Sequence, residues 1–229
     1  NTTTWLTNPV IIHAYKTAGT YIVTLTVKDN KKLTDSTQIQ ITVIDYPTAD
    51  FSYLPATPLE GETVTFNASA SEPNGGSIIS YQWDFGDGST DHDITVTHMY
   101  PNVGNYVVVL NVTDDEGLWD AETKTVTVSI HNIAVTDLTA APNSVKIGQQ
   151  ISLSRTVANK GNFSEPFDVT AYYEDTSIDT KSVTKLASGA FWTVPIAWNT
   201  TGVNVGSYTL KAIATPVLGE TQKGDNTLL

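Results

Sequence analysis

The 229-residue sequence contains no cysteine. This absence excludes disulfide bonds, cysteine-ligated zinc and thiol catalysis, although many secreted domains fold without disulfides, so the compartment stays open. No apolar run approaches the roughly 18 to 20 residues that a membrane helix needs, so we expect no membrane insertion in this segment. Residues 1–8 lack the basic start and apolar stretch of a secretory signal. We therefore expect that any targeting segment was removed or lies upstream.

Charged side chains are also scarce, at 16% of the chain. Basic residues number only 12 against 24 acidic ones, which gives a formal net charge of −12. Because this charge repels phosphate backbones, it argues against nucleic acid as a partner. Thr, Ser and Asn must cover the surface instead.

Signatures of enzymes are missing from the sequence. It contains no Gly-x-Ser-x-Gly elbow, no His-Glu-x-x-His helix and no phosphate-cradling glycine loop. Asp91 and Asp93 have the residue types of a glycosidase pair, but nothing around them indicates a cleft. We interpret the chain as non-catalytic, with a hydrolase as the remotest hypothesis.

An internal repeat is the strongest positive feature. Residues 98–128 match residues 13–43 without a gap, with His98 repeating His13 and Val128 repeating Val43, an offset of 85 residues (98 − 13). A repeat of that length, built of short alternating strands, has the size of one β-sandwich domain.

Apolar and polar residues alternate with period two in both copies, and no segment shows a helical period. Each alternating set is expected to line one sheet of a sandwich. The sets are Tyr21, Val23, Leu25 and Val27 in the first copy, and Tyr106, Val108, Leu110 and Val112 in the second. The chain is predicted to be all-β.

The sequence after about residue 132 has a different pattern and predicts a further domain. In its segment 191–198, Trp192, Val194, Ile196 and Trp198 share one face, while Phe191 and Pro195 point the other way. Because proline cannot donate to a ladder, we expect this strand to be an edge or to carry a bulge. The other predicted strands are 150–159, 166–173, 178–183 and 206–214.

These patterns divide the chain into three predicted parts: residues 1–45, residues 46–131 and residues 132–229. Both junctions are only a few residues long, and Pro47 restricts one of them. Short linkers predict tandem sandwich domains in a semi-rigid rod. About 45 residues cannot enclose a stable core alone, so residues 1–45 are expected to pair with upstream sequence or with strands of another molecule.

Residues Trp83-Asp84-Phe85-Gly86-Asp87-Gly88, His98-x-Tyr100, Gly104-x-Tyr106 and Val112-Thr113-Asp114 carry a resemblance to a known family. With them, residues 46 to about 131 resemble the PKD (polycystic kidney disease) repeat. Residues 1–45 resemble the second half of another such repeat, with His13, Tyr15, Gly19, Tyr21 and Asp29 in the corresponding places.

The last part resembles the CARDB (cell-adhesion-related) module. The resemblance is carried by Val145-x-x-Gly148, Val157-Ala158-Asn159-Lys160-Gly161, Trp198 and Gly206-x-Tyr208-x-Leu210. The chain stops where a last strand is expected. Both resemblances imply immunoglobulin-like sandwiches outside the cell, in surface-layer and adhesion proteins of archaea and bacteria or as accessory modules of secreted hydrolases, and neither family is catalytic.

The motif residues are expected to be structural. Trp83 and Phe85 alternate with Asp84 and are predicted to be core residues. Asp87, between two glycines, is predicted to accept hydrogen bonds from backbone amides of its turn. His98 recurs as His13, which favours an architectural role over metal binding.

Calcium is the one cofactor with a candidate site. The resemblance implies that some PKD repeats bind calcium through an acidic turn ahead of the motif strand, which here is residues 71–75. Glu72, Asn74 and Asp84 are the predicted ligands, with oxygen donors of the kind that calcium prefers. Asn74 stands where an aspartate is common in the family, so a weaker affinity is expected.

Two aromatic residues are candidate binding residues. Trp119 aligns with Thr34 in the first copy, so the fold needs no tryptophan there. It is expected either to stack on a sugar ring or a protein partner, or to pack against the neighbouring domain. Phe191, off the core face of the last part, is the second candidate.

Five Asn-x-Ser/Thr sequons, at Asn1, Asn67, Asn111, Asn162 and Asn199, are candidate glycosylation sites. Alternation places Asn67 and Asn111 on the outer faces of their strands.

Two functions remain after these arguments. The first is a non-catalytic structural or adhesive segment of a larger extracellular, cell-surface glycoprotein, acting as a spacer or packing against other surface proteins or copies of itself. The alternative is a carbohydrate-binding accessory segment of a secreted hydrolase, in which Trp119 or Phe191 contacts polysaccharide.

Overall fold

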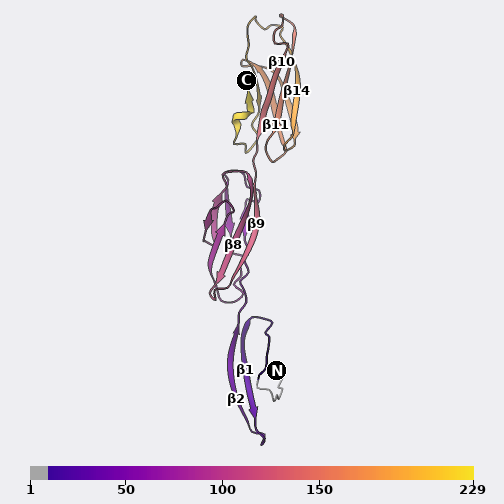
Figure 1. The fold of residues 1–229 in the computed structure, drawn as a ribbon. Helices are drawn as coiled ribbons and strands as arrows, with labels where there is room; N and C mark the ends of the chain where they lie inside the picture. Colours follow the sequence, from indigo (N-terminus) through magenta and orange to yellow (C-terminus); the bar gives the residue numbers. More distant parts are fainter. Residues whose placement is uncertain (1–9) are drawn as a thin grey trace. The chain divides into compact units, whose positions relative to one another are not determined.

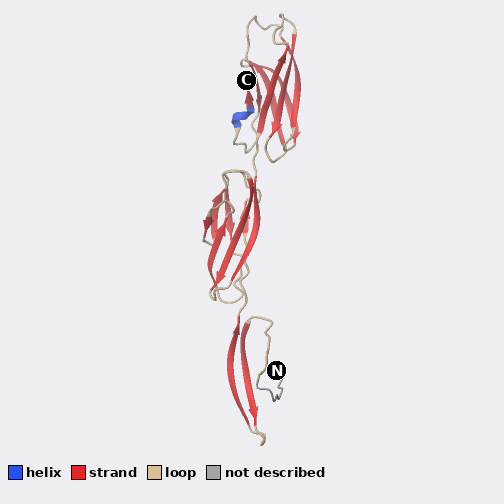
Figure 2. Ribbon diagram, in the orientation of Figure 1, coloured by secondary structure: helices blue, strands red, loops and turns tan. Residues whose placement is uncertain are grey.

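The computed structural model describes residues 10–229 and consists almost entirely of β-strands, as the sequence predicts. Figure 2 shows these strands with a single short 3-10 helix, η1 (Lys223–Asn226), near the C-terminus. Contacts divide the chain into two compact units. The first comprises Asn1–Ala56, Val64–His98 and Tyr106–Val126, and the second comprises Thr57–Thr63, Met99–Asn105 and Thr127–Leu229. The predicted rod and the predicted domain boundaries stay predictions.

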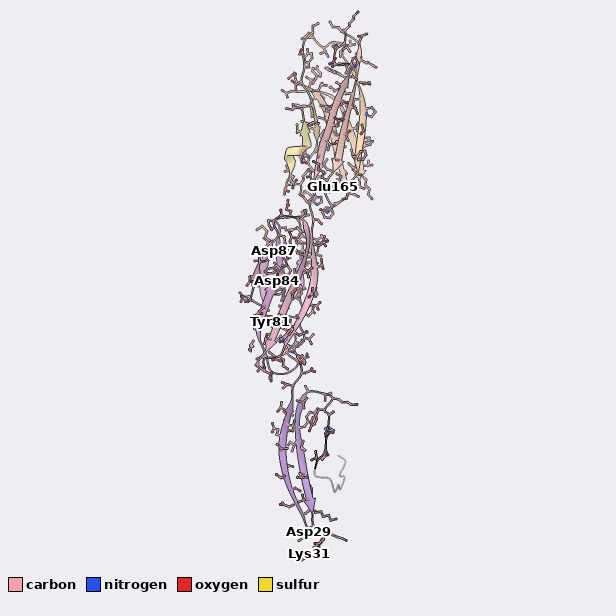
Figure 3. All side chains as sticks on the ribbon, viewed as in Figure 1. Asp29, Lys31, Tyr81, Asp84, Asp87 and Glu165 are labelled. Atoms are coloured by element: carbon pink, nitrogen blue, oxygen red, sulfur yellow. The ribbon has the colours of Figure 1, made fainter. Side chains whose placement is uncertain are left out.

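The first unit begins with a β-hairpin. Strands β1 (Gly19–Lys28) and β2 (Thr34–Val43) pair antiparallel along their whole lengths (Figure 1). Its turn carries Asp29 and Lys31, labelled in Figure 3. Within residues 10–229, these two strands form a sheet of their own.

The first unit also holds most residues of a β-sandwich, while the ends of some of its strands belong to the second unit. One sheet has the order β3-β4-β7 and the other has the order β6-β5-β8-β9. The strands are β3 (Ser52–Leu54), β4 (Thr63–Asn67), β5 (Ile78–Asp84), β6 (Thr90–Asp91), β7 (Thr95–Met99), β8 (Gly104–Asp114) and β9 (Trp119–Val128). Inward alternation buries Val64 and Phe66 on β4, and Val108, Leu110 and Val112 on β8.

The second unit contains another sandwich. Its sheets have the orders β10-β11-β14 and β13-β12-β15-β16. The strands are β10 (Ile133–Ala141), β11 (Gln150–Asn159), β12 (Glu165–Tyr173), β13 (Thr176–Leu186), β14 (Phe191–Asn199), β15 (Leu210–Ala214) and β16 (Thr227–Leu228). The two-residue strand β16 pairs with β15. The expectation that the sandwich lacks its last strand stays a prediction.

Strand β14 confirms most of the pattern predicted for it. Val194, Ile196 and Trp198 are buried, whereas Phe191 and Pro195 are exposed. Trp192, predicted to share the face of the buried residues, is 37% exposed near the start of the strand. The strand lies at the edge of its sheet, where the missing amide of Pro195 breaks no inner ladder.

Buried polar groups also organise the second unit. Glu220 accepts hydrogen bonds from the amide of Ile133 at 2.7 Å, the amide of Val217 at 2.9 Å and Nδ2 of Asn226 at 3.1 Å. The Nδ1 atom of His131 lies 2.5 Å from Oε1 of the buried Glu165. These contacts tie the segment before β10 and the C-terminal segment to the sandwich.

One expectation needs correction. The apolar face of the first copy was predicted to line a sandwich, but Val23, Leu25 and Val27 are exposed. The physical reason is that no second sheet covers β1 and β2 within the part of the chain that the structure describes.

Candidate functional site

The motif residues Trp83 and Phe85 lie in the core, as predicted. Each is 2% exposed, and their rings stack with centroids 6.3 Å apart. The indole nitrogen of Trp83 donates a hydrogen bond to the carbonyl oxygen of Asp93 at 2.8 Å. Because the ring is buried and its single donor is satisfied, Trp83 stabilises the sandwich and is not available to a ligand.

A histidine–carboxylate pair joins the turn after the motif strand to strand β7. The Nε2 atom of His98 lies 2.7 Å from Oδ2 of Asp87, and the imidazole stacks on Phe85 at 4.3 Å. The other oxygen of Asp87 accepts the amide of Ser89 at 3.0 Å, which confirms the predicted turn role. Burial by itself raises the pKa of Asp87, but the hydrogen bonds from His98 and Ser89 outweigh it and hold the pKa below its usual value.

The predicted calcium ligands are not brought together. Glu72 and Asn74 precede β5, where Nδ2 of Asn74 donates to the carbonyl of Tyr46 at 2.9 Å. Asp84 is the last residue of β5, six residues after Ile78, which places it about 20 Å further along the strand. Figure 3 shows Tyr81, Asp84 and Asp87 in succession along this part of the unit. The three-residue ligand set is therefore corrected, because an extended strand separates its members.

Calcium binding by this chain stays a prediction. Among residues 10–229, no group of three or more imidazole and carboxylate side chains is arranged to hold a metal ion.

Trp119 is a surface residue. It is 60% exposed at the start of β9, whereas Trp83 and Trp198 are buried. The next residue, Asp120, faces the other way, and its carboxylate accepts the amide of Ala49 at 2.9 Å. The hydrogen bond of Asp120 therefore anchors the strand. Because successive side chains point to opposite faces, the indole of Trp119 points outward.

Phe191 is the second exposed aromatic, at 72%, and begins β14 of the second unit. Its cross-strand neighbour on β11 is Ala158, whose small side chain leaves the ring uncovered. The two candidate binding residues thus belong to different units, and each is a separate site.

The side-chain oxygens of three sequon asparagines accept hydrogen bonds from backbone amides. The Oδ1 atoms of Asn67 and Asn199 accept the amides two residues further on, of Ser69 and Thr201. Oδ1 of Asn162 accepts the amide of Ile130 at 2.8 Å. The remaining sequons are Asn111, half-buried on β8, and Asn1, which lies outside the described residues. Glycosylation stays a prediction at all five.

The second unit contains an open cleft of about 440 Å³ that the sequence patterns did not predict. Trp198 and Tyr208 line it, and both rings pack against Tyr173. Val145 and Val203 also line the cleft. The cleft forms between the segments around residues 142–147 and 200–208, which strand patterns do not place in space.

No helix among the described residues has the length and apolarity needed to cross a bilayer.

Family models match all three parts of the chain. Residues 1–43 and residues 45–130 each match a model described as a PKD domain, and residues 132–227 match the CARDB model. The chain therefore belongs to the proteins that carry PKD domains followed by a CARDB module. Both kinds of module are non-catalytic.

Relatives of this chain occur in bacterial proteases. It is 48% identical over 69 residues to a microbial collagenase of Vibrio alginolyticus, which covers 30% of this chain and 8% of the relative. It is 30% identical over 169 residues to the collagenase ColA of Clostridium perfringens, which covers 73% of this chain and 15% of the relative. The chain thus spans less than a sixth of either relative. These relatives are bacterial, and the expectation of an archaeal surface layer stays a prediction.

Among solved structures, the chain is similar to the PKD1 domain of the Vibrio cholerae metalloprotease PrtV. The sequence identity is 37% and the TM-score is 0.33, and the match covers 37% of this chain and 98% of that domain.

Proposed function

We propose that this chain is a non-catalytic, extracellular accessory segment of a larger secreted hydrolase, and that it holds a polymeric substrate near the catalytic part. The observation that carries the proposal is the exposed indole of Trp119, at a position where the first copy of the repeat has Thr34. The relationship to segments of bacterial collagenases supports it.

The surroundings of Trp119 suit a polymer better than a small molecule. On the same side of β9, Ala121, Thr123 and Thr125 are exposed and short. An indole beside a row of small side chains presents a flat surface, on which a sugar ring or a peptide backbone can stack. Small ligands, in contrast, are usually enclosed in concave pockets.

Two polymer chemistries fit this surface, polysaccharide and collagen. Collagen is one polymer to test, because the relatives are named as collagenases. Polysaccharide is the other, because an exposed indole can stack on a sugar ring. Phe191 supplies a second, independent contact from the second unit, since its ring is exposed on β14.

The test is retention of the purified chain on fibrillar collagen, cellulose and chitin. We expect retention on one of them, with an affinity that falls about tenfold or more in Trp119→Ala, because truncation of an anchoring aromatic commonly costs that much. Leu54→Ala, an exposed apolar residue of β3 in the other sheet of the sandwich, is the matched control and should bind as the parent does. Retention of Trp119→Ala equal to that of the parent would contradict the proposal.

A second candidate function is a spacer or adhesive segment of a cell-surface protein, whose partners are other surface proteins or copies of itself. The turn at Asp29 repeats at Asp114, and this observation favours a spacer. Repeated domains can lengthen a protein as well as bind partners. Absence of binding to every polymer by the parent chain would favour this candidate.

A further inference from the structure

The open cleft of the second unit lies between two segments that leave the sheets. One wall is residues 142–147, between β10 and β11, and the other is residues 203–208, between β14 and β15. The sequence pattern predicts a strand over residues 206–214, but β15 begins only at Leu210. The segment before Leu210 therefore lies outside the strand, where it forms a wall of the cleft.

Hydrogen bonds hold both walls in place. The amide of Lys146 donates to Oε1 of Gln149, and the amide of Gln149 donates to the carbonyl of Lys146, both at 3.1 Å. The carbonyl of Gln149 accepts the amide of Thr200 at 3.2 Å and its hydroxyl at 2.8 Å. In the other wall, the hydroxyl of Tyr208 donates to the carbonyl of Asn204 at 2.8 Å. A ligand therefore meets walls that are already ordered, which lowers the entropic cost of binding.

The cleft has the size and the apolar surface of a ligand site. Its volume of about 440 Å³ falls within the range of about 300–1,000 Å³ that is usual for such sites. The half-buried ring of Tyr208 lines it. Each wall also carries an exposed apolar side chain, Ile147 at 67% and Val205 at 86%. These groups suit a ligand that has an apolar face.

Short polar side chains from both walls line the same cleft. They are exposed and make no hydrogen bond within residues 10–229; they are Asn143, Ser144, Asn204 and Ser207. Hydroxyl and amide groups can both donate and accept hydrogen bonds. A sugar combines an apolar ring face with hydroxyl groups at its edge, so its chemistry matches this lining.

The charge of the lining is opposite in sign to that of the chain. The chain has 24 acidic against 12 basic residues, yet no aspartate or glutamate lines the cleft, and Lys146 is its single charged residue. The ammonium group of Lys146 makes no ion pair within the part of the chain that the structure describes. An unpaired cation in such a place favours a ligand that carries a carboxylate.

We propose that this cleft binds an acidic oligosaccharide, a sugar chain that carries uronate carboxylates. Lys146 contacts a carboxylate, and the hydroxyl and amide side chains of both walls contact the sugar hydroxyls. A peptide matches the lining less well, because apolar peptide side chains would leave these polar groups without partners. The site lies in the second unit and does not involve Trp119, so it does not rest on the function proposed above.

The experiment follows the amide NMR signals of the isotope-labelled chain during titration with a galacturonate trisaccharide and with a hyaluronan tetrasaccharide. We expect signals of residues 142–147 and 203–208 to shift with at least one of them, which also distinguishes a plant from an animal source. Lys146→Gln should weaken this binding about tenfold or more, because a hydrogen bond to a charged group is lost. The methyl ester of the galacturonate trisaccharide, which lacks the charge, should bind the parent chain with a similar loss.

Lys185→Gln is the matched control, since it removes an exposed lysine of β13 that does not line the cleft. It should bind as the parent does, and so should Trp119→Ala. The proposal would be overturned by an unchanged affinity in Lys146→Gln, by loss of binding in Trp119→Ala, or by the absence of shifts at the cleft with both glycans. Shifts at the cleft with an acidic peptide and with neither glycan would make it a peptide site and would also overturn the proposal.

Discussion

Asp29 and Asp114, 85 residues apart (114 − 29), close the same turn with the same atoms. Oδ1 of Asp29 accepts the amides of Lys31 and Leu33, both at 2.8 Å. Oδ1 of Asp114 accepts the amides of Glu116 and Leu118, at 3.1 and 2.8 Å. One aspartate is exposed and the other is 1% exposed. The same turn therefore exists in two environments within one chain.

Replacing Asp114 by alanine should lower the free energy of unfolding by about 1–3 kcal/mol, because two turn amides lose a buried acceptor. Asp114→Asn keeps Oδ1 and should cost less. Asp29→Ala is the matched control, and its effect should be smaller because water can reach the freed amides. Urea unfolding measures all three, and equal losses for Asp29→Ala and Asp114→Ala would contradict the argument.

Glu220→Ala should destabilise the second unit strongly. Three donors, the amides of Ile133 and Val217 and the side-chain amide of Asn226, would lose their acceptor inside the protein. We expect a loss of about 3 kcal/mol or more, since each buried unsatisfied donor costs about 1–3 kcal/mol. Glu220→Gln retains one acceptor oxygen and should lie between the parent and the alanine variant. A thermal midpoint of Glu220→Ala that equals the parent's would contradict this prediction.

Arg155 is a buried cation on the inner face of β11. Its Nη2 donates to the carbonyl of Val169 at 3.0 Å and lies 3.8 Å from Oδ2 of Asp179, while Nε and Nη1 have no partner within the described residues. Burial lowers the pKa of the guanidinium, and the charge of Asp179 offsets this only in part. Arg155→Met should therefore leave the unfolding free energy unchanged or raise it by about 1–4 kcal/mol, because an apolar side chain removes the desolvation cost.

The control for Arg155 is Asp179→Ala, which removes the countercharge, leaves the cation buried and should destabilise the protein. Chemical denaturation separates the two variants. A large destabilisation by Arg155→Met would show that its hydrogen bond outweighs the cost of desolvation.

Asp87 should make stability depend on pH in the acid range. Its folded pKa lies below the unfolded value of about 3.9. The stabilisation is therefore fully present above the unfolded pKa and is lost as the pH falls through the folded pKa. Asp87→Asn should flatten the dependence below about pH 4 relative to the parent. Thermal midpoints between pH 2 and 7 check this, and identical slopes for parent and variant would contradict it.

The placement of strands followed from alternation wherever a strand has one buried face. Strand 150–159 was predicted with its observed bounds, and the edge position of β14 followed from Pro195. Strand β10 was missed, because Ile133, Ala134 and Val135 are all buried and break the alternation. Asp84 was grouped with Asn74 because the family resemblance implies a calcium site at the turn ahead of the motif strand, but the extended strand β5 carries the two residues apart.

The order of residues alone determined that the chain repeats, that it is all-β and which side chains share a face, because these depend on local periodicity and on matching segments. Only the tertiary structure decided whether a face is covered. Val23 and Val108 occupy equivalent places in the repeat, yet one is 42% exposed and the other 0%. Burial depends on a second sheet from a distant segment, and local sequence does not contain that information.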